Sequence, residues 1–478
     1  MSEPVSENIP PARPRRVLVI GGGPSGLVTL RNLLERGDFE DVQLVERRDD
    51  VGGVWHLDNP KPNTNAKRWP SPAYRGLIGN VISEFLSFSS HPLFPEPPST
   101  ANGQPFPSLA ETHNYLRAFA APLLARGSIR LNTEVLKVEE LQNRQGWRVI
   151  LKSGGSELEE KWDAVVVAVA FYDHTSYPDT LGVGAVRQAG LASHAQTWRG
   201  PDGYEDKRIL VIGNANSGND ITAQLAPVAH AVFQSIRRPN FPGFPSLPDA
   251  RISHVTPVAE YVVQDVEIGS RILPTVTARL IDNTAIENLN CVIFATGYFP
   301  HPDFVHVLQQ DGNLGPIVSP QDRHIPSLHR YILYAKNPSL AFVGTAMACY
   351  TPFTIADMCS TWLALAWSHG GGVACPTTLP DLLAFERARM DAVAVGRREM
   401  AASNEYGIAS DLASYCVLGP YEEEYANDLR SDVVKARPEL DKVLPVWNEE
   451  KTALRDAMFM TKRKALELAR KGAVVKDN

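Results

Sequence analysis

A glycine-rich stretch near the N-terminus constrains the fold of this chain more than any other feature of its sequence. The apolar run 17–20 predicts a short buried strand, and Gly21, Gly23 and Gly26 follow it with the spacing G-x-G-x-x-G. The first glycine of this pattern permits a tight turn, the second lets the backbone approach a pyrophosphate, and the third lets the next helix pack closely on the strand. A helix that begins near Leu27 would present free N–H groups to the phosphates. The predicted dinucleotide-binding loop consists of Gly21, Gly22, Gly23, Pro24, Ser25 and Gly26.

A carboxylate at a suitable distance supports this interpretation. Residues 42–45 predict a second short strand, and Glu46 follows it twenty residues after Gly26. An acidic side chain at that place can accept hydrogen bonds from the hydroxyls of a ribose. A glycine cluster alone is more often a plain turn, so the prediction depends on the strand, the glycines, the helix and the acid occurring together.

The same pattern occurs again near the middle of the chain. A predicted strand over 208–212, a loop from Gly213 to Gly218, a predicted helix over 221–229 and a strand over 231–236 follow one another. Ala215 stands at the position of the middle glycine, where it adds a methyl group to the side that a pyrophosphate would approach. The repeat predicts a second dinucleotide unit.

The two units differ in charge at the ribose end. Glu46 follows the second strand of the first unit, whereas Arg237 and Arg238 follow that of the second. An acid there repels the 2′-phosphate of NADP, and an arginine binds it. Two arginines at a strand end can also simply face solvent, but after a second glycine loop we favour phosphate binding. The first unit is therefore predicted to take FAD and the second NADP(H), with Asn216 and Ser217 at the pyrophosphate.

Two different cofactors predict a redox enzyme, because an isoalloxazine beside a nicotinamide accepts hydride. The continuous apolar run 163–170 is typical of a parallel strand covered on both faces. We expect an α/β fold with two Rossmann-like domains, the second inserted in the first. The expected boundaries are a flexible N-terminal tail over 1–15, an FAD-binding domain over 16–170 and 297–478, whose second part carries the C-terminal helices, and an NADP-binding domain over 171–296.

The composition limits which kinds of partner the protein can bind and in which cellular compartment it is expected. The 478 residues carry a formal net charge of −7, which argues against general affinity for nucleic acids. No apolar run is long enough to span a membrane, and residues 1–15 lack the apolar segment of a signal peptide. The five cysteines are odd in number and lack metal-ligand spacing, so we expect reduced thiols in a cytoplasmic protein and no metal site.

The cysteines also bear on the electron acceptor. Disulfide reductases built on this plan place a redox cysteine pair soon after the first ribose acid. The first cysteine of this chain is Cys291, far beyond Glu46. The remaining acceptors are O₂, a quinone or a protein.

Several short motifs, in their order along the chain, resemble those of the flavin-containing monooxygenases, which are class B flavoprotein monooxygenases. Gly190 and His194 match the centre of the motif F-x-G-x-x-x-H-x-x-x-F/Y, with Gln188 and Trp198 at its aromatic ends. The chain departs from the family pattern at Ala215 and at the run Ala168-Val169-Ala170. The further matches are Gly52-Gly53-x-Trp55, Tyr74-x-x-Leu77-x-x-Asn80, Asn216-Ser217-Gly218-Asn219-Asp220 and Ala295-Thr296-Gly297-Tyr298.

The resemblance implies an NADPH- and FAD-dependent monooxygenase. In this family O₂ adds to C4a of the reduced flavin, and the resulting (hydro)peroxyflavin transfers one oxygen to an amine nitrogen or a thioether sulfur of a small molecule while NADP⁺ stays bound. Asn80 is the residue expected beside the reacting atoms, as the catalytic residue. Asn80 is also expected to contact both the flavin and the nicotinamide. The further residues expected to bind the cofactors are Gly53, Val54, Trp55, Val81, Val135, Gly213, Gly218, Asp220, Thr296 and Gly297.

Two alternatives stay open. The related Baeyer–Villiger enzymes oxidise ketones, and Trp198-Arg199 after His194 lies between the two motif patterns. A non-catalytic flavoprotein that acts as a redox-gated binding partner belongs to a different class. The expected partners are a small-molecule substrate and O₂, with a homo-oligomer as one option, and the sequence does not identify the substrate.

Overall fold

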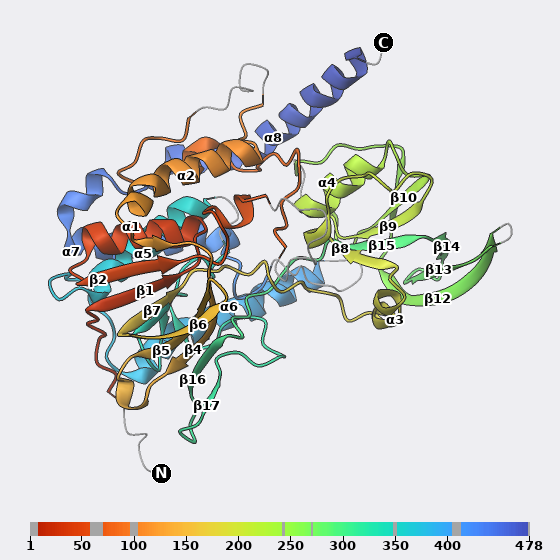
Figure 1. Cartoon of the computed structure of the whole chain (residues 1–478). Coiled ribbons are helices and arrows are strands. Elements are labelled where there is room, and N and C mark those ends of the chain that lie inside the picture. Colours follow the sequence, from red (N-terminus) through yellow and green to blue (C-terminus); the bar gives the residue numbers. More distant parts are fainter. Residues whose placement is uncertain are drawn as a thin grey trace.

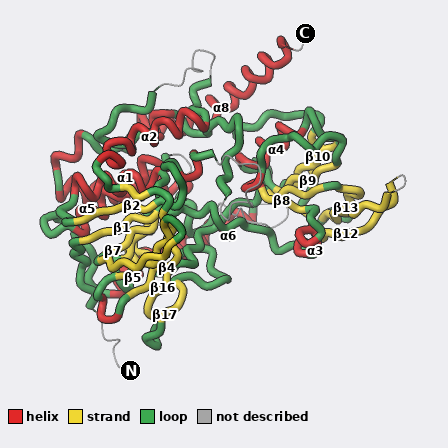
Figure 2. Tube along the Cα trace, in the orientation of Figure 1, coloured by secondary structure: helices red, strands yellow, loops and turns green. Residues whose placement is uncertain are grey.

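The chain forms two bodies that lie side by side (Figure 1). The computed structural model describes residues 8–57, 70–95, 104–240, 244–268, 271–347, 351–403 and 413–476. The larger body contains the N-terminal strand and most of the helices, and the smaller body consists of strands and helices from the middle of the chain (Figure 2). Helix α8 (Glu449–Lys476) begins near the larger body and projects outward at its C-terminal end.

A seven-stranded sheet forms the centre of the larger body, in the order β18-β19-β20-β7-β1-β2-β3. Strands β1, β2, β3, β7 and β20 pair in parallel, and Ile20 of β1 lies opposite Val45 and Val167. The strands are β1 (Arg16–Ile20), β2 (Asp41–Val45), β3 (Ile129–Arg130), β7 (Ala164–Val167), β18 (Leu328–His329), β19 (Leu333–Tyr334) and β20 (Leu340–Phe342).

Both faces of this sheet are covered, because successive side chains of a strand point to opposite sides. Val17 and Val19 pack into an apolar cluster with the helices, whereas Leu18 and Ile20 pack against a second, five-stranded sheet. The covering helices are α1 (Pro24–Arg36), α2 (Leu109–Ala125), α5 (Pro352–Trp367) and α7 (Glu422–Ala436). The second sheet, in the order β17-β16-β4-β5-β6, consists of β4 (Thr133–Glu140), β5 (Trp147–Ser153), β6 (Ser156–Trp162), β16 (Val305–Leu308) and β17 (Leu314–Pro316).

The smaller body repeats this three-layer plan. Its parallel sheet has the order β11-β10-β9-β15-β8. Val211 on one face packs against Ile221 and Leu225 of helix α4 (Asn216–Leu225), and Leu210 on the other face packs against an antiparallel sheet. The parallel strands are β8 (Ala192–His194), β9 (Arg208–Ile212), β10 (Ala231–Ser235), β11 (Ile252–Val255) and β15 (Cys291–Phe294).

The antiparallel sheet of the smaller body was not anticipated from the sequence. It consists of β12 (Val258–Ile268), β13 (Arg271–Leu280) and β14 (Ala285–Leu289), and the short helix α3 (Val183–Gln188) lies beside it. Val276 and Ala278 of β13 are fully buried, whereas Ile272 and Leu273 are 72% and 42% exposed. Apolar residues on both sides of a strand obscure the alternation that predicts a half-buried strand.

Two segments connect the bodies and run beside each other. The chain leaves the larger body after β7 and returns after β15 to reach β16. The N–H of Ser176 donates to the carbonyl of Gly297 at 2.9 Å, and Thr175 pairs with Tyr298 in an antiparallel bridge. The smaller body is therefore inserted in the sequence of the larger one, between two segments that lie side by side.

Residues 8–15 pack on the larger body, which corrects the expectation of a flexible tail over all of 1–15. Ile9 is 1% exposed, and its N–H donates to the carbonyl of Thr377 at 2.7 Å. Burial of this side chain and the backbone hydrogen bond offset the entropy cost of ordering the segment. Residues 1–7 lie outside the described part of the chain.

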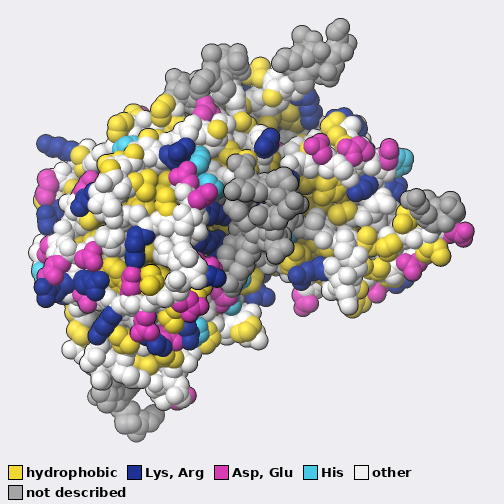
Figure 3. Space-filling model, in the orientation of Figure 1, with side chains coloured by type: hydrophobic (Ala, Val, Ile, Leu, Met, Phe, Trp, Pro, Cys, Tyr) yellow, Lys and Arg dark blue, Asp and Glu magenta, His cyan; other side chains and the backbone are white. Residues whose placement is uncertain are grey.

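The C-terminal segment is helical, as expected, with α6 (Leu379–Ala402) followed by α7 and α8. Among the described residues there is no helix whose length and apolar character would let it cross a membrane. Figure 3 shows basic and acidic side chains interspersed over the visible face.

Candidate active site

The first glycine loop has the backbone geometry that its sequence pattern requires. Gly21 has a φ of +106°, and a Cβ on Gly26 would lie 1.8 Å from the carbonyl oxygen of Gly21. Only glycine permits helix α1 to pack this closely. Gly23 is the N-cap of α1, and no side chain caps the helix there. The first N–H groups of α1 are therefore available to a phosphate.

The turn after β2 packs against this loop. Gly52 and Gly53 have φ values of +119° and +57°, and a Cβ on Gly53 would lie 2.9 Å from Cα of Gly23. The N–H of Gly52 donates to the carbonyl of Gly22 at 2.8 Å. The two glycine turns together leave a space beside the backbone that would be filled if these glycines carried side chains.

Glu46 lies at the ribose side of the loop and is buried. Its Oε2 accepts a hydrogen bond from the N–H of Gly22 at 2.6 Å, and its Oε1 accepts one from the N–H of Arg48 at 2.9 Å. These bonds hold the carboxylate in one orientation. Each oxygen retains a second lone pair for a ribose hydroxyl.

The second glycine loop has nearly the same backbone. Gly213 has a φ of +113°, and a Cβ on Gly218 would lie 2.2 Å from its carbonyl oxygen. Ala215 caps α4 with φ −79° and ψ −169°, compared with −77° and −179° for Gly23 in the first loop. Alanine adopts this extended conformation without strain, so the replacement leaves the backbone of the loop unchanged and adds only a methyl group to its surface.

The predicted ribose end of the second unit has a half-buried arginine. In both units the N–H of the first loop glycine donates to the last residue of the second strand. Ile236 therefore occupies the place of Glu46, and Arg237 and Arg238 follow it. Nη1 of Arg238 is buried and has no hydrogen-bond partner among the described residues. A buried N–H without an acceptor is costly, and a 2′-phosphate supplies such an acceptor.

A cavity of about 950 Å³, here called the first cavity, opens at the carboxyl ends of β1, β2 and β7. Ligands of open parallel sheets bind at this edge. The predicted site residues that line it are Gly21, Gly23, Pro24, Ser25, Glu46, Gly53, Val54, Trp55, Asn80, Val135 and Asn216.

A second cavity of about 1210 Å³ lies beside α4. It extends from the N-terminus of that helix to α8, so it is bordered by both bodies and by the C-terminal helix. The predicted site residues that line it are Val54, Trp55, Asn80, Val81, Asn216, Ser217 and Asp220.

The two cavities meet at a junction defined by Trp55, Asn80, Tyr172 and Asn216, which line both. The Asn80 side chain makes no hydrogen bond to any of the residues that the structure describes. An amide has two donors and an acceptor. Asn80 can therefore bond to groups that enter from either cavity.

Some predicted contact residues line neither cavity. The Thr296 hydroxyl donates to the carbonyl of Ser176, and Gly297, with a φ of +77°, closes the turn at the passage between the bodies. The others are Gly22, Gly26, Gly213, Gly218, Arg237 and Arg238. The glycines among them belong to the two loops but lie on the side that faces away from the cavities.

His194 of the family-like motif lies at the end of β8 and is buried. Its Nδ1 accepts the N–H of Gln196 at 3.1 Å, and its ring stands edge-on to Tyr298 and Tyr177. Burial lowers the pKa of His194 to about 4. The ring is therefore neutral near pH 7 and accepts a hydrogen bond at the passage between the bodies.

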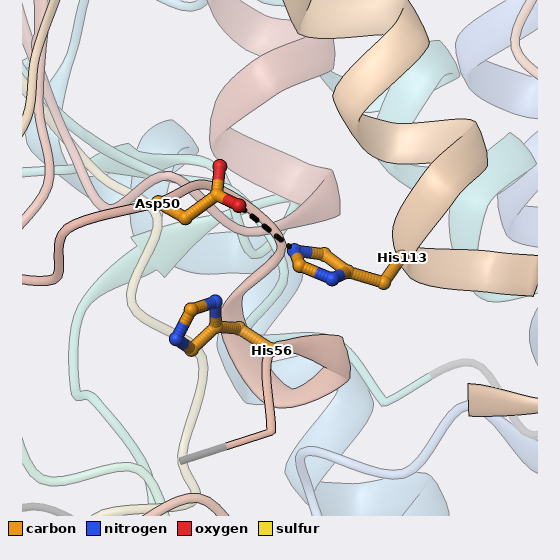
Figure 4. A group of neighbouring side chains, drawn as sticks. All are labelled: Asp50, His56 and His113. Carbon is orange, nitrogen blue, oxygen red and sulfur yellow. Dashed lines mark ion pairs between the residues drawn. The ribbon is translucent and has the colours of Figure 1, made fainter. Parts of the chain in front are cut away.

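Two histidines, His56 and His113, lie close to Asp50 (Figure 4). His113 also packs against the Gly52–Gly53 turn, because a Cβ on Gly52 would lie 2.7 Å from its Cδ2. Nε2 of His113 lies 2.9 Å from the carbonyl oxygen of Val51 and 3.5 Å from Oδ2 of Asp50, and its ring stands edge-on to His56. Asp50, His56 and His113 bring their ligand atoms within 4.8 Å of one another. Nε2 of His113 must carry its proton to donate to the Val51 carbonyl, and Nε of Arg117 lies 3.2 Å from Oδ2 of Asp50, so both groups already have protein partners.

Sequence reasoning did not single out Tyr172, although it lines both cavities. Its place was readable, because Phe171 and Tyr172 follow the carboxyl end of a central parallel strand, where such sheets bind ligands. Burial raises the pKa of Tyr172, so the hydroxyl stays protonated.

The fold and the site define a class of protein, a flavoprotein oxidoreductase with one dinucleotide site in each body. The residues fit both cofactors, since an uncapped helix N-terminus and a glycine loop face each cavity, and a buried guanidinium N–H of the second unit has no acceptor among the residues that the structure describes.

Comparison with known proteins shows which family the chain resembles. Residues 14–241 match the family model of flavin-binding monooxygenase-like proteins. The flavin-containing monooxygenase FMO GS-OX-like 2 of Arabidopsis thaliana is 28% identical over 384 residues, which are 77% of this chain and 76% of that protein. Dimethylaniline monooxygenase (N-oxide-forming) 2 of Pan troglodytes is 26% identical over 463 residues, 84% of this chain and 82% of that protein.

A solved structure supports the same fold. The S-allyl-L-cysteine S-oxygenase of Allium sativum superimposes with a TM-score of 0.71 at 21% identity, over 94% of this chain and 93% of that chain. The chain is similar to flavin-containing monooxygenases over most of its length, and it is an FAD- and NADPH-dependent oxidoreductase. The predicted α/β fold with two Rossmann-like domains, the enzyme class and both cofactors are confirmed; the roles of individual residues stay predictions.

Proposed function

We propose that this monooxygenase transfers one atom of O₂ to a thioether sulfur or an amine nitrogen of a small molecule. The observation that carries the proposal is the junction at Asn80, where a cavity lined by the first glycine loop meets a cavity lined by the second. When bound, the flavin accepts hydride from NADPH and supplies the oxygen chemistry.

The cysteines support O₂ as the acceptor. Among the described residues, no cysteine lines either cavity. Cys359 and Cys416 are buried, and burial raises the pKa of each thiol to about 12. Thiols that stay protonated are poor redox nucleophiles, so the cysteines that the structure describes offer no dithiol route at the junction.

The names of similar proteins suggest the substrate class. The plant structure is titled an oxygenase of the thioether sulfur in S-allyl-L-cysteine, and the chimpanzee relative forms N-oxides. Thioethers and tertiary amines share an unshared electron pair that attacks an electrophilic oxygen. We therefore propose both thioethers and tertiary amines as substrates of this protein.

Within this proposal each loop has a role. The first loop and Glu46 hold FAD, and the second loop with Arg237 and Arg238 holds NADP(H). Asn80 donates a hydrogen bond to the group that reacts with substrate and accepts one from the nicotinamide amide. Trp55 and Tyr172 surround that point with aromatic side chains that limit the access of water.

A product assay tests the proposal. Purified protein with FAD, NADPH and O₂ is offered a thioether, a tertiary amine and a cyclic ketone in parallel. We expect a sulfoxide or an N-oxide in proportion to the NADPH consumed. A lactone from the ketone alone would establish Baeyer–Villiger chemistry instead, and hydrogen peroxide as the sole product with every compound would contradict the proposal.

Asn80→Ala tests the junction itself. We expect the variant to bind FAD and to be reduced by NADPH at the wild-type rate, because hydride transfer requires only stacked rings. The ratio of product to hydrogen peroxide should fall roughly five- to hundredfold, as for the loss of one buried hydrogen bond of about 1–3 kcal/mol. Product and peroxide are measured per NADPH oxidised.

Arg75→Ala is the matched control, since Arg75 is exposed on the same segment and lines neither cavity. This variant should keep the wild-type ratio. An Asn80→Ala protein with unchanged coupling and a lower melting temperature would show that Asn80 only shapes its loop.

A further inference from the structure

A buried lysine of the C-terminal helix contacts the segment that carries Asn80. Lys462 on α8 is 6% exposed, and its Nζ donates to the carbonyl of Gly79 at 2.7 Å. The ammonium also lies 4.8 Å from the ring centre of Phe106. Burial of an ammonium is costly unless it is paired, so a buried lysine calls for a specific role.

The contact fixes the peptide that precedes Asn80. The N–H of Gly79 donates to the carbonyl of Pro107 at 2.8 Å, and its C=O accepts from Lys462. Both polar groups of Gly79 are therefore bonded to neighbouring segments. Since the Asn80 side chain has no partner among the described residues, its direction depends on this backbone.

Apolar packing holds α8 against the same segment. Met458 and Ala465 form a buried cluster with Phe85 and Phe106, and Ile78 and Val81 pack against that cluster. A salt bridge between Lys451 and Glu84 adds a second polar contact. The helix thus covers the stretch from residue 78 to residue 85 on one side.

The same helix also reaches the smaller body. Phe459 stacks on Phe244 with ring centres 6.2 Å apart, and Arg470 donates to the carbonyl of Pro248 at 2.8 Å. Lys462 lines the second cavity together with Asp220 of α4. Burial lowers the pKa of Lys462 to about 8, and the attraction of Asp220 opposes this decrease. The group is thus mostly charged at pH 7.

We propose that Lys462 is a positioning residue, which holds the Gly79–Asn80 peptide so that the Asn80 amide faces the junction of the two cavities. The inference rests on the proposed function, because it assigns Lys462 a role that acts through Asn80. A charge-assisted hydrogen bond to a carbonyl is stronger than a neutral one. Its loss would free the peptide while the apolar contacts of α8 keep the helix in place.

Lys462→Met tests the proposal, with Lys464→Met as the matched control on the exposed side of the same helix. Methionine has a similar length and suits a buried apolar site. We expect FAD content and the rate of anaerobic reduction by NADPH to stay at wild-type values. The ratio of product to hydrogen peroxide should fall about tenfold in Lys462→Met and not in Lys464→Met. If Lys462→Met does not fold, Lys462→Gln, which keeps a neutral donor, should show a smaller decrease.

A double variant shows whether the lysine acts through the asparagine. In the Asn80→Ala background, Lys462→Met should cause no further loss of coupling, because interacting residues are not additive. Full additivity, or wild-type coupling in Lys462→Met, would overturn the inference. A wild-type protein that makes no oxygenated product would instead overturn the proposed function, so the two failures are distinguishable.

Discussion

The two dinucleotide units share one backbone plan and differ at the positions that touch a nucleotide. Both loops turn at a glycine with positive φ, and both helices pack so closely that a side chain at Gly26 or Gly218 would overlap a carbonyl oxygen. The first unit has Gly23 at the predicted pyrophosphate position and Glu46 at the predicted ribose position. The second has Ala215 and a pair of arginines at the same places.

The surroundings of the two units differ as well. Helix α1 is covered by α5, and Asp357 of α5, fully buried, pairs with Arg31 of α1 at 3.2 Å. Both helices border a cavity at their N-termini, and α4 lines the second cavity along residues 216–223 as well. We expect the first unit, whose helix is buried under α5, to hold its cofactor more tightly than the second.

The largest expected effect comes from filling the glycine positions under the helices. Gly26→Ala places a Cβ 1.8 Å from a carbonyl oxygen in the first unit, and Gly218→Ala places one 2.2 Å from a carbonyl oxygen in the second. Overpacking of this kind costs about 3 kcal/mol or more. We expect Gly26→Ala to yield protein without FAD, and Gly218→Ala to yield yellow protein that dithionite reduces and NADPH does not.

The matched control is Gly396→Ala in α6, where a Cβ would meet nothing within 4 Å. It should retain both FAD and reduction by NADPH. If Gly218→Ala lost FAD as readily as Gly26→Ala, the two units would not bind separate cofactors as predicted. Flavin absorbance and anaerobic reduction distinguish these outcomes.

The next effect concerns the charge at the ribose end. Replacing both Arg237 and Arg238 with alanine should raise the KM for NADPH by about tenfold or more per lost contact, since a charge-assisted hydrogen bond contributes about 1.5–3 kcal/mol. The KM for NADH should change little, because NADH lacks the 2′-phosphate. Arg398→Ala on α6, which lines neither cavity, serves as the control. An equal rise for both coenzymes would argue against phosphate binding by the arginines.

A smaller effect is expected at the turns that follow the central strands. Ala170 after β7 has a φ of +56°, and Gly297 at the matching place after β15 has a φ of +77°. An alanine in the left-handed region costs about 1–2 kcal/mol of stability. Glycine avoids this cost, but it also raises the conformational entropy of the unfolded chain, which cancels part of the gain. Ala170→Gly should therefore stabilise the protein by about 0.5–1 kcal/mol and Gly297→Ala should destabilise it. Thermal unfolding of FAD-loaded protein measures both, and changes of the same sign would refute this account of the turns.

The smallest effect is expected at Ala215. Its backbone is extended, so Ala215→Gly should not relieve strain, and it should remove one methyl group from the approach to the pyrophosphate. We expect the KM for NADPH to fall by about two- to fivefold, equivalent to less than ~1 kcal/mol. A rise in KM would show that the methyl group contacts the bound nucleotide favourably.

The glycine loops could be predicted from the sequence because their spacing follows from covalent geometry. The helix starts were predicted too late, at Leu27 and Ile221, whereas α1 begins at Pro24 and α4 at Asn216. Proline is favoured in the first turn of a helix, and the loop itself provides that turn.

Other features depend on contacts between distant segments. The β12–β14 sheet escaped prediction because its apolar residues lie on both faces of its strands. The bond from Lys462 to Gly79 joins residues 383 positions apart, so no local pattern indicates it. The position of Ala170 in the left-handed region is likewise set by the fold around it.

The central claim is that the two units bring FAD and NADPH together at one junction. Anaerobic stopped-flow mixing of the oxidised protein with NADPH deuterated at C4 of the nicotinamide tests it most directly, with NADH in a parallel experiment. The account predicts that NADPH bleaches the flavin absorbance with a primary isotope effect for one of the two deuterated faces, and that NADH does so far more slowly. A flavin that NADPH does not reduce, or that NADH reduces equally fast, would contradict it.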